Sequence, residues 1–190
     1  MSFTGAVGNF IRATYPDDEQ VRKKELEAST PLRVLRAWKE FTSGYQEDPA
    51  DVLTKGFENS VYDEMVSCFH IPIRSTCEHH ILPIIGEAHF AYVPDKKIVG
   101  LSKIPRFIDI LCRRLQVQEA LTTQIVDVFQ DTVKPFGCAV TILAYHCCMI
   151  SRGVKISSIV AKTTALRGSM KDNVEQRNEY LAAVPKELQL

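Results

Sequence analysis

The sequence predicts one α+β domain built on an antiparallel four-stranded sheet, with two long helices on one face and flanking helices at both ends. Two observations carry this expectation. The segments between residues 60 and 166 follow the order strand, strand, helix, helix, strand, strand, and the 190-residue chain shows no internal repeat, linker or low-complexity segment. Such a sheet leaves its two edges unpaired, and self-association of copies can cover them.

The N-terminal part of the chain predicts a short extension followed by a helix. Residues 1–29 are polar and mixed, with a short helix expected over Asp17–Ala28. Thr30 and Pro31 then predict an N-cap followed by proline at the first helical position, where a single domain over residues 30–190 begins. Apolar residues recur at helical spacing after this point and stop near Gly44; they are Leu32, Val34, Leu35, Trp38 and Phe41.

The central part predicts the sheet and its helices. β-branched and aromatic residues indicate strands over Ser60–Ile73 and Gly86–Val93, and an apolar run and a Thr-rich run indicate two more, over Cys138–Ile150 and Ile156–Leu166. Between the two pairs, Ser102 is expected to cap the first long helix. The core faces of the two helices are expected at Ile104, Phe107, Ile108, Leu111 and Leu115, and at Val117, Leu121, Ile125, Val128 and Phe129.

Composition disfavours several classes of protein. Lys and Arg total 23 and balance 23 Asp and Glu, so no broad basic surface for nucleic acid is expected. The N-terminus lacks a basic segment followed by an apolar run, and no membrane-length apolar stretch occurs, which predicts a cytoplasmic protein without a membrane partner. The six cysteines are therefore expected to stay reduced and to serve metal binding or burial. The spacings of thioredoxin-like, deaminase, dinucleotide-binding and P-loop motifs do not occur.

A metal site is indicated by two clusters of His and Cys. Residues 77–80 read Cys-Glu-His-His, a mixture of donors that suits zinc. A third ligand is expected from His146, Cys147 and Cys148 at the end of a predicted strand, where alternation turns one of the two adjacent cysteines toward the site. Three ligands with an open fourth position indicate a catalytic zinc that activates water. The alternatives are a closed structural zinc site, or buried cysteines beside surface histidines.

A second group of residues suits an anionic nucleotide. Ser102, Lys103 and Arg106 lie at the start of the first long helix, where free N–H groups and the helix dipole favour an anion. Together with Lys103 and Arg106, the side chains of Arg152, Arg33 and Arg36 carry enough positive charge to bind a triphosphate if the fold brings them together. Otherwise each is a solvated surface residue. Gln118 and Glu119 open the next helix, where a carboxylate either interacts with the helix dipole or accepts two hydrogen bonds from a guanine edge.

Four segments together resemble the GTP cyclohydrolase I family. They are STCEHH at 75–80, VGLSK at 99–103, RLQVQE at 114–119 and HCCMISRG at 146–153, within a resemblance that covers about residues 30–184. The resemblance implies the tunnelling fold, in which the sheets of several subunits join into a barrel. It further implies a homo-oligomer, typically a decamer of two pentamers, with active sites at subunit interfaces.

The resemblance also implies a role for each candidate residue. The zinc ligands would be Cys77, His80 and Cys148, and the proton-transfer residues His79 and His146. Glu119 with Gln118 would hold the guanine. The ribose triphosphate would be held by Ser102, Lys103, Arg106 and Arg152, with Arg33 and Arg36 from a neighbouring subunit.

The implied reaction is zinc-dependent hydrolysis of GTP at guanine C8. The ring opens, formate leaves, and the ribose carbons rearrange and close a pterin ring to give 7,8-dihydroneopterin triphosphate, the first step toward pterins, folate or 7-deazaguanines. The rivals are a non-catalytic zinc-binding ring protein of the same fold and a tunnelling-fold nitrile reductase, which would need no zinc. Three features depart from the family pattern: the short region ahead of Thr30, Pro105 in the first turn of a helix, and Arg167.

Overall fold

The computed structural model describes residues 2–15, 20–58 and 61–189. The chain divides into two compact units, Met1–Ser43 and Gly44–Leu190, which are described separately. No helix in the described ranges is both long and apolar enough to cross a membrane.

The first unit consists of two packed helices, α1 (Phe3–Thr14) and α2 (Gln20–Phe41). The Ser2 side chain caps α1 by accepting a hydrogen bond from the Gly5 N–H at 3.2 Å. An ion pair of 3.0 Å between Arg12 and Glu27 joins the helices. The mixed polar sequence of residues 1–29 did not predict α1.

The expected helix start at Thr30 is wrong, because α2 runs through this point with Pro31 inside it. An interior proline loses one helical hydrogen bond and crowds the preceding turn, at a cost of about 3 kcal/mol. Pro31 is buried and lines a hollow between α1 and α2, so tertiary packing opposes that cost. The helix expected over Asp17–Ala28 forms the first half of α2, although residues 17–19 lie outside the described ranges. The expected boundary between residues 29 and 30 falls inside α2, and the limits of the catalytic domain stay a prediction.

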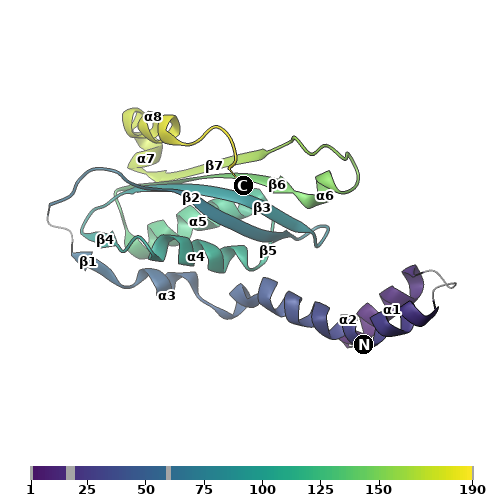
Figure 1. The fold of residues 1–190 in the computed structure, drawn as a ribbon. Helices are drawn as coiled ribbons and strands as arrows, with labels where there is room; N and C mark the ends of the chain where they lie inside the picture. The colour runs from purple at the N-terminus through teal and green to yellow at the C-terminus, as the bar shows by residue number, and fades with distance from the viewer. Residues whose placement is uncertain (1, 16–19, 59–60, 190) are drawn as a thin grey trace. The chain divides into compact units, whose positions relative to one another are not determined.

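The second unit confirms the α+β class (Figure 1). In the described ranges its main sheet has the order β5-β2-β3-β6-β7, formed by Leu115–Gln116, Val66–Cys77, Pro83–Val93, Gly137–His146 and Ala161–Gly168. β1 (Gly56–Glu58) and β4 (Lys97–Val99) form a separate pair. The helical segments are η1 (Ser43–Gln46), α3 (Pro49–Leu53), α4 (Lys103–Cys112), α5 (Gln118–Val133), α6 (Cys147–Ile150), α7 (Ser169–Asp172) and α8 (Val174–Ala183).

The sheet differs from the expected four strands in its edge and its strand limits. β2, β3, β6 and β7 pair antiparallel, but β5 adds a two-residue parallel strand beside the end of β2. β6 ends at His146, and the next four residues form the helical turn α6. β7 begins at Ala161 rather than Ile156, because pairing with β6 starts there. β2 begins at Val66; of the residues expected before it, Ser60 lies outside the described ranges.

The two faces of the sheet carry separate cores because side chains alternate along β3. Phe90 and Tyr92 face α4 and α5, and the rings of Phe90 and Phe129 lie 4.7 Å apart. Ala91 and Val93 face the other way, toward Met170 and Tyr180 of α7 and α8. Figure 1 shows α4 and α5 on one side of the sheet and α7 and α8 on the other.

The structure explains two of the departures from the family pattern. Pro105 is the third residue of α4, where the backbone N–H has no helical partner, so proline costs little there. Arg167 on β7 donates to Asp127 of α5 at 2.6 Å and ties the edge strand to the helix beneath it.

Candidate metal centre and active site

Three strand ends meet at one end of the main sheet. Thr76 at the end of β2 pairs with Pro83 at the start of β3, and Ile84 pairs with His146 at the end of β6. The loop after β2 and the turn α6 after β6 therefore lie side by side. Both carry the sulfur and nitrogen donors that the sequence singled out.

The loop after β2 folds back on itself and places His80 over Cys77. The Ile81 N–H donates to the Cys77 carbonyl at 2.9 Å, and the Cys77 N–H donates to the Leu82 carbonyl at 2.8 Å. Ile81 has a φ of 55°, a left-handed conformation that is strained for a β-branched residue. As a result, the His80 Nδ1 lies 3.8 Å from the Cys77 Sγ.

Cys77, His80 and Cys148 each offer a ligand atom, and these atoms lie within 4.8 Å of one another. Two sulfurs and one imidazole nitrogen form a donor set suited to a transition-metal ion. Burial and the neighbouring Cys77 raise the pKa of the Cys148 thiol, and a bound cation would oppose both effects. Strand alternation was the wrong reason to expect one of the two adjacent cysteines, since both belong to the helical turn α6.

His146 is held beside this group by the buried side chain of Gln118. The His146 Nε2 lies 2.7 Å from the Gln118 Oε1, and Gln118 is 2% exposed. The Gln118 amide nitrogen donates to the carbonyls of Ile142 and Ala161 at 3.3 and 3.1 Å, which orients the amide oxygen toward His146. An oxygen acceptor requires the proton on Nε2, so the neutral ring keeps a free lone pair on Nδ1.

The electrostatic environment favours the neutral form of His146. Burial lowers its pKa, and the nearby Glu119 carboxylate opposes this shift. With an ordinary pKa near 6.5 as the starting point, His146 is an unprotonated base at pH 7. The structure thus places a half-buried histidine two residues before Cys148, one of the three possible metal ligands.

Glu119 and Gln118 have different surroundings although they are adjacent. Glu119 is exposed on the first turn of α5 and lines a hollow of about 200 Å³, together with Thr122, Thr123, Thr163 and Thr164. Gln118 has its amide donor directed at protein acceptors, one of which is the Thr163 hydroxyl at 3.1 Å. A guanine contact from Gln118 would therefore have no free side-chain donor.

Two further expected residues lie in the same neighbourhood. His79 is exposed in the loop after β2, with its Nε2 3.6 Å from the Glu78 carboxylate. Arg152 follows α6 and is close enough to Cys148 to lower that thiol's pKa, against the larger effects of burial and Cys77. Both side chains are open to solvent and free to meet a ligand.

Ser102, Lys103 and Arg106 lie away from the metal-ligating group within one chain. They stand at the start of α4, whereas the end of α4 leads into β5, which pairs with Cys77. Ten helical residues at about 1.5 Å each separate the two ends by about 15 Å. Ser102 occupies the N-cap position but its side chain makes no capping hydrogen bond, contrary to expectation.

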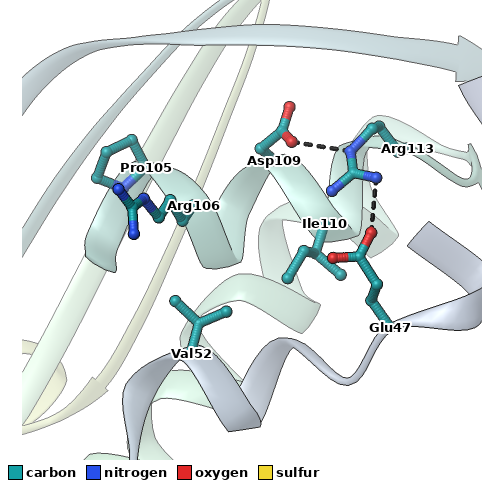
Figure 2. A pocket seen from close by; sticks show the side chains of 7 residues that line it. All are labelled: Glu47, Val52, Pro105, Arg106, Asp109, Ile110 and Arg113. Atoms are coloured by element: carbon teal, nitrogen blue, oxygen red, sulfur yellow. Dashed lines mark hydrogen bonds and ion pairs between the residues drawn. The ribbon is translucent and has the colours of Figure 1, made fainter. Parts of the chain in front are cut away.

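Arg106 lines a cavity of about 330 Å³ on the surface of α4, with Val52, Pro105 and Ile110 among its other walls (Figure 2). On the far wall, Arg113 contacts Glu47 at 2.7 Å and Asp109 at 2.8 Å. Arg106 takes no part in the interactions drawn there.

Arg33 and Arg36 lie on α2 in the first unit, and both are exposed there. They are thus available to a ligand, but they are not part of the second unit that carries the metal-ligating group.

Sequence reasoning missed the threonines that complete the site. The Thr163 hydroxyl contacts Gln118 and lies 2.6 Å from the Thr122 hydroxyl, so β7 and α5 are joined beneath Glu119. The Thr-rich run predicted a strand, but nothing in its spacing indicated that one threonine would face Gln118.

The arrangement is that of an α+β protein in which three possible metal ligands lie near a half-buried histidine. Comparison with known proteins gives a match to the family model described as GTP cyclohydrolase I over residues 7–185. The chain is 44% identical over 183 residues to GTP cyclohydrolase 1 of Chlorobaculum tepidum, covering 96% of this chain and 80% of that protein. It is 42% identical to GTP cyclohydrolase 1 of Campylobacter curvus, covering 96% and 94%. The chain belongs to the GTP cyclohydrolase I family, and the resemblance seen in the four segments is confirmed.

Among solved structures, the archaeosine synthase QueF-Like in the apo form is similar with a TM-score of 0.45 and 15% identity, over 58% of this chain and 97% of that one. At this level the likeness carries no argument about activity.

Proposed function

We propose that the protein is a zinc-dependent GTP cyclohydrolase I, which hydrolyses GTP at guanine C8, releases formate and forms 7,8-dihydroneopterin triphosphate. The observation that carries the proposal is the group of possible ligands Cys77, His80 and Cys148, with His146, whose pKa is lowered by burial, at the strand end that leads into Cys148. The relatives named GTP cyclohydrolase 1, which match nearly the whole chain, support GTP as the substrate.

Cys77, His80 and Cys148 would hold the zinc ion and leave a fourth position open to water or substrate. When bound, zinc supplies Lewis-acid chemistry by lowering the pKa of water to near neutrality. The free cysteines of the chain fit a reducing compartment, and we propose the cytoplasm.

His146 and His79 would transfer protons. The lone pair on the His146 Nδ1 accepts a proton, while Gln118 holds the opposite side of the ring and stabilises the imidazolium that results. Gln118 acts here as a positioning residue rather than as a guanine ligand. His79, exposed beside its Glu78 partner, can exchange its proton with solvent or with a leaving group.

Glu119 would select guanine. Its carboxylate offers two acceptors to the N1–H and 2-amino groups of the base, and its exposed position on α5 leaves both oxygens available. Adenine presents an acceptor at N1 and lacks the 2-amino group, so it would leave the carboxylate unpaired.

The phosphate-binding residues support an active site shared between subunits. Because Ser102, Lys103 and Arg106 lie about 15 Å from the end of α4 that adjoins Cys77, one chain does not assemble the whole site. Arg152 would act from the chain that supplies the metal ligands, and the α4 cations, with Arg33 and Arg36, from neighbouring chains.

The open sheet edges support the same conclusion. Among the described residues, β7 has one unpaired edge, and β5 covers only Thr76 and Cys77 along the outer edge of β2. Joining the β2 edge of one copy to the β7 edge of the next would close the sheets into the barrel of the tunnelling fold, with a decamer of two pentamers as the expected assembly. Light scattering should give a mass well above a dimer, and a fully active monomer would contradict this part of the proposal.

The activity is tested by incubating the zinc-loaded protein with GTP. Formate should appear, and oxidation followed by dephosphorylation of the product should give fluorescent neopterin. Zinc-loaded oligomer that yields neither product would refute the proposal and would favour a non-catalytic zinc-binding ring protein. ATP serves as the matched control and should give no product.

A further inference from the structure

A second cluster of possible ligands lies on the other face of the sheet. His70, Glu87 and His89 each offer a ligand atom within 4.8 Å of the other two. Side chains alternate along β3, so Glu87 and His89 share the face of Ala91, whereas Ile84, Ala88 and Phe90 belong to the core against α4 and α5. The cluster is thus separate from the site at Cys77.

A break in β2 brings His70 into this cluster. The pairing of β2 with β3 shifts register between Cys68 and Ile71, and His70 within this bulge has a φ of 56°. Bulges redirect a side chain out of the regular alternation. Here the His70 Nδ1 is redirected to a hydrogen bond with the Glu87 Oε2.

The buried members of the cluster are only partly satisfied by protein groups. His89 is 0% exposed. Its Nδ1 accepts one long hydrogen bond of 3.3 Å from the backbone N–H of His70, and within the described ranges its Nε2 has no partner. Glu87 is 3% exposed, and its second oxygen accepts from the Gln189 N–H. A buried Nε2 without a partner is unfavourable. When the ring proton moves to Nδ1 and the long His70 contact is released, the Nε2 lone pair is available to coordinate a cation.

We propose that His70, Glu87 and His89 bind a second divalent transition-metal ion, such as Zn²⁺ or Co²⁺. Two imidazoles and one carboxylate are a donor set typical of these ions, and the cation would replace the hydrogen bond between His70 and Glu87. The proposal does not depend on GTP hydrolysis, since none of the three residues belongs to the proposed active site.

The positive charge of Lys162 lies near the cluster and should weaken the binding of a cation there. Lys162 is exposed on β7, in register with Leu143, which in turn pairs with Glu87. Burial lowers the pKa of His89, and the charges of His70 and Lys162 act in the same direction while Glu87 opposes them. A cation at the cluster would feel the same repulsion from Lys162, so Lys162→Gln should bind it more tightly than the wild type.

The experiment titrates the metal-free, full-length protein with Co²⁺, counting bound ions and following thiolate-to-cobalt absorption. The wild type should bind two ions per chain, of which only one produces the thiolate band. In His70→Asn, the affinity of the second ion, which has no sulfur ligand, should fall about tenfold or more. The thiolate band from the ion at Cys77 should remain. Asn tolerates the left-handed backbone at this position, and an unchanged melting temperature of the metal-free protein checks the fold.

Matched variants separate this site from the first. His79→Asn removes an exposed histidine outside the cluster and should still bind two ions, whereas Cys148→Ser should lose the thiolate band and keep the sulfur-free ion. A wild type that binds a single ion, or a His70→Asn variant that binds two with wild-type affinity, would overturn the proposal. Neither result would bear on formate release by the Cys77 site.

Discussion

Replacing Gln118 with leucine tests whether this buried amide positions a catalytic histidine. The change removes the acceptor 2.7 Å from the His146 Nε2 and the donor shared by Ile142, Ala161 and Thr163. Leucine has a similar size and is apolar, which suits a position that is 2% exposed. His146 would then lose both the fixed position of its ring and the preference for a free lone pair on Nδ1.

The magnitude follows from the charge that His146 carries after accepting a proton. A hydrogen bond to a charged group contributes about 1.5 to 3 kcal/mol, and each 1.36 kcal/mol corresponds to about a tenfold change in rate. We therefore expect kcat to fall about 10- to 150-fold. KM for GTP should change far less, because the Gln118 amide donor faces protein acceptors rather than the ligand. The buried acceptors left without a donor should reduce the free energy of unfolding by about 1 to 3 kcal/mol.

A second buried glutamine provides the control. Gln116 is 3% exposed and donates to the Leu111 carbonyl at 2.9 Å and to Gln124 at 3.1 Å, but it does not contact His146. Gln116→Leu should lose comparable stability and keep most of its kcat. The assay measures formate release, zinc content and melting temperature for both variants. Equal kcat values in the two zinc-loaded variants would refute a positioning role for Gln118.

Four further predictions concern the same site. Glu119→Gln should lower GTP affinity at least about tenfold with unchanged zinc content. If Glu119 only interacts with the helix dipole, the same change should reduce the free energy of unfolding by about 0.3 to 1 kcal/mol and leave turnover normal. Cys148→Ser should deplete zinc and Cys147→Ser should not; metal analysis with the reverse pattern would show that the wrong cysteine was chosen. Because burial lowers the pKa of His146, kcat/KM should stay high at pH 7 and fall only as the pH drops below the ordinary value of 6.5. The contribution of His146 to the free energy of unfolding should be present above pH 6.5 and be lost as the pH falls through the lowered pKa of the folded state. The reason is that the unfolded chain binds the proton first. A loss of stability as the pH rises through this range would contradict the assignment.

Local patterns in the sequence predicted much of the second unit. The apolar spacing of Phe107 and Phe129 placed both in the core beneath the sheet, because helical periodicity depends on neighbours three and four residues apart. The short spacing between Cys77 and His80 likewise placed two ligand atoms together, since a single turn of the chain spans it. The equal numbers of acidic and basic residues and the four family-like segments were also readable without any structure.

Other features depended on contacts between distant segments. Pro31 should begin a helix by local rules, yet it lies inside α2, because packing against α1 outweighs the lost hydrogen bond. The partners of the Gln118 amide could not be read from the sequence, because β6 and β7 supply them from 24 and 43 residues away.

The sequence by itself determined the fold class, the metal-ligating motif and the family, because each follows from residue types at short spacing or from matched segments. Only the tertiary structure decided that His146 is neutral with its free lone pair on Nδ1, and that the cations of α4 lie at the opposite end of that helix from Cys77. It also brought His70 to Glu87 and His89 through a bulge in β2. The physical reason is that burial, tautomer and side-chain orientation depend on groups that only the folded chain brings within hydrogen-bonding distance.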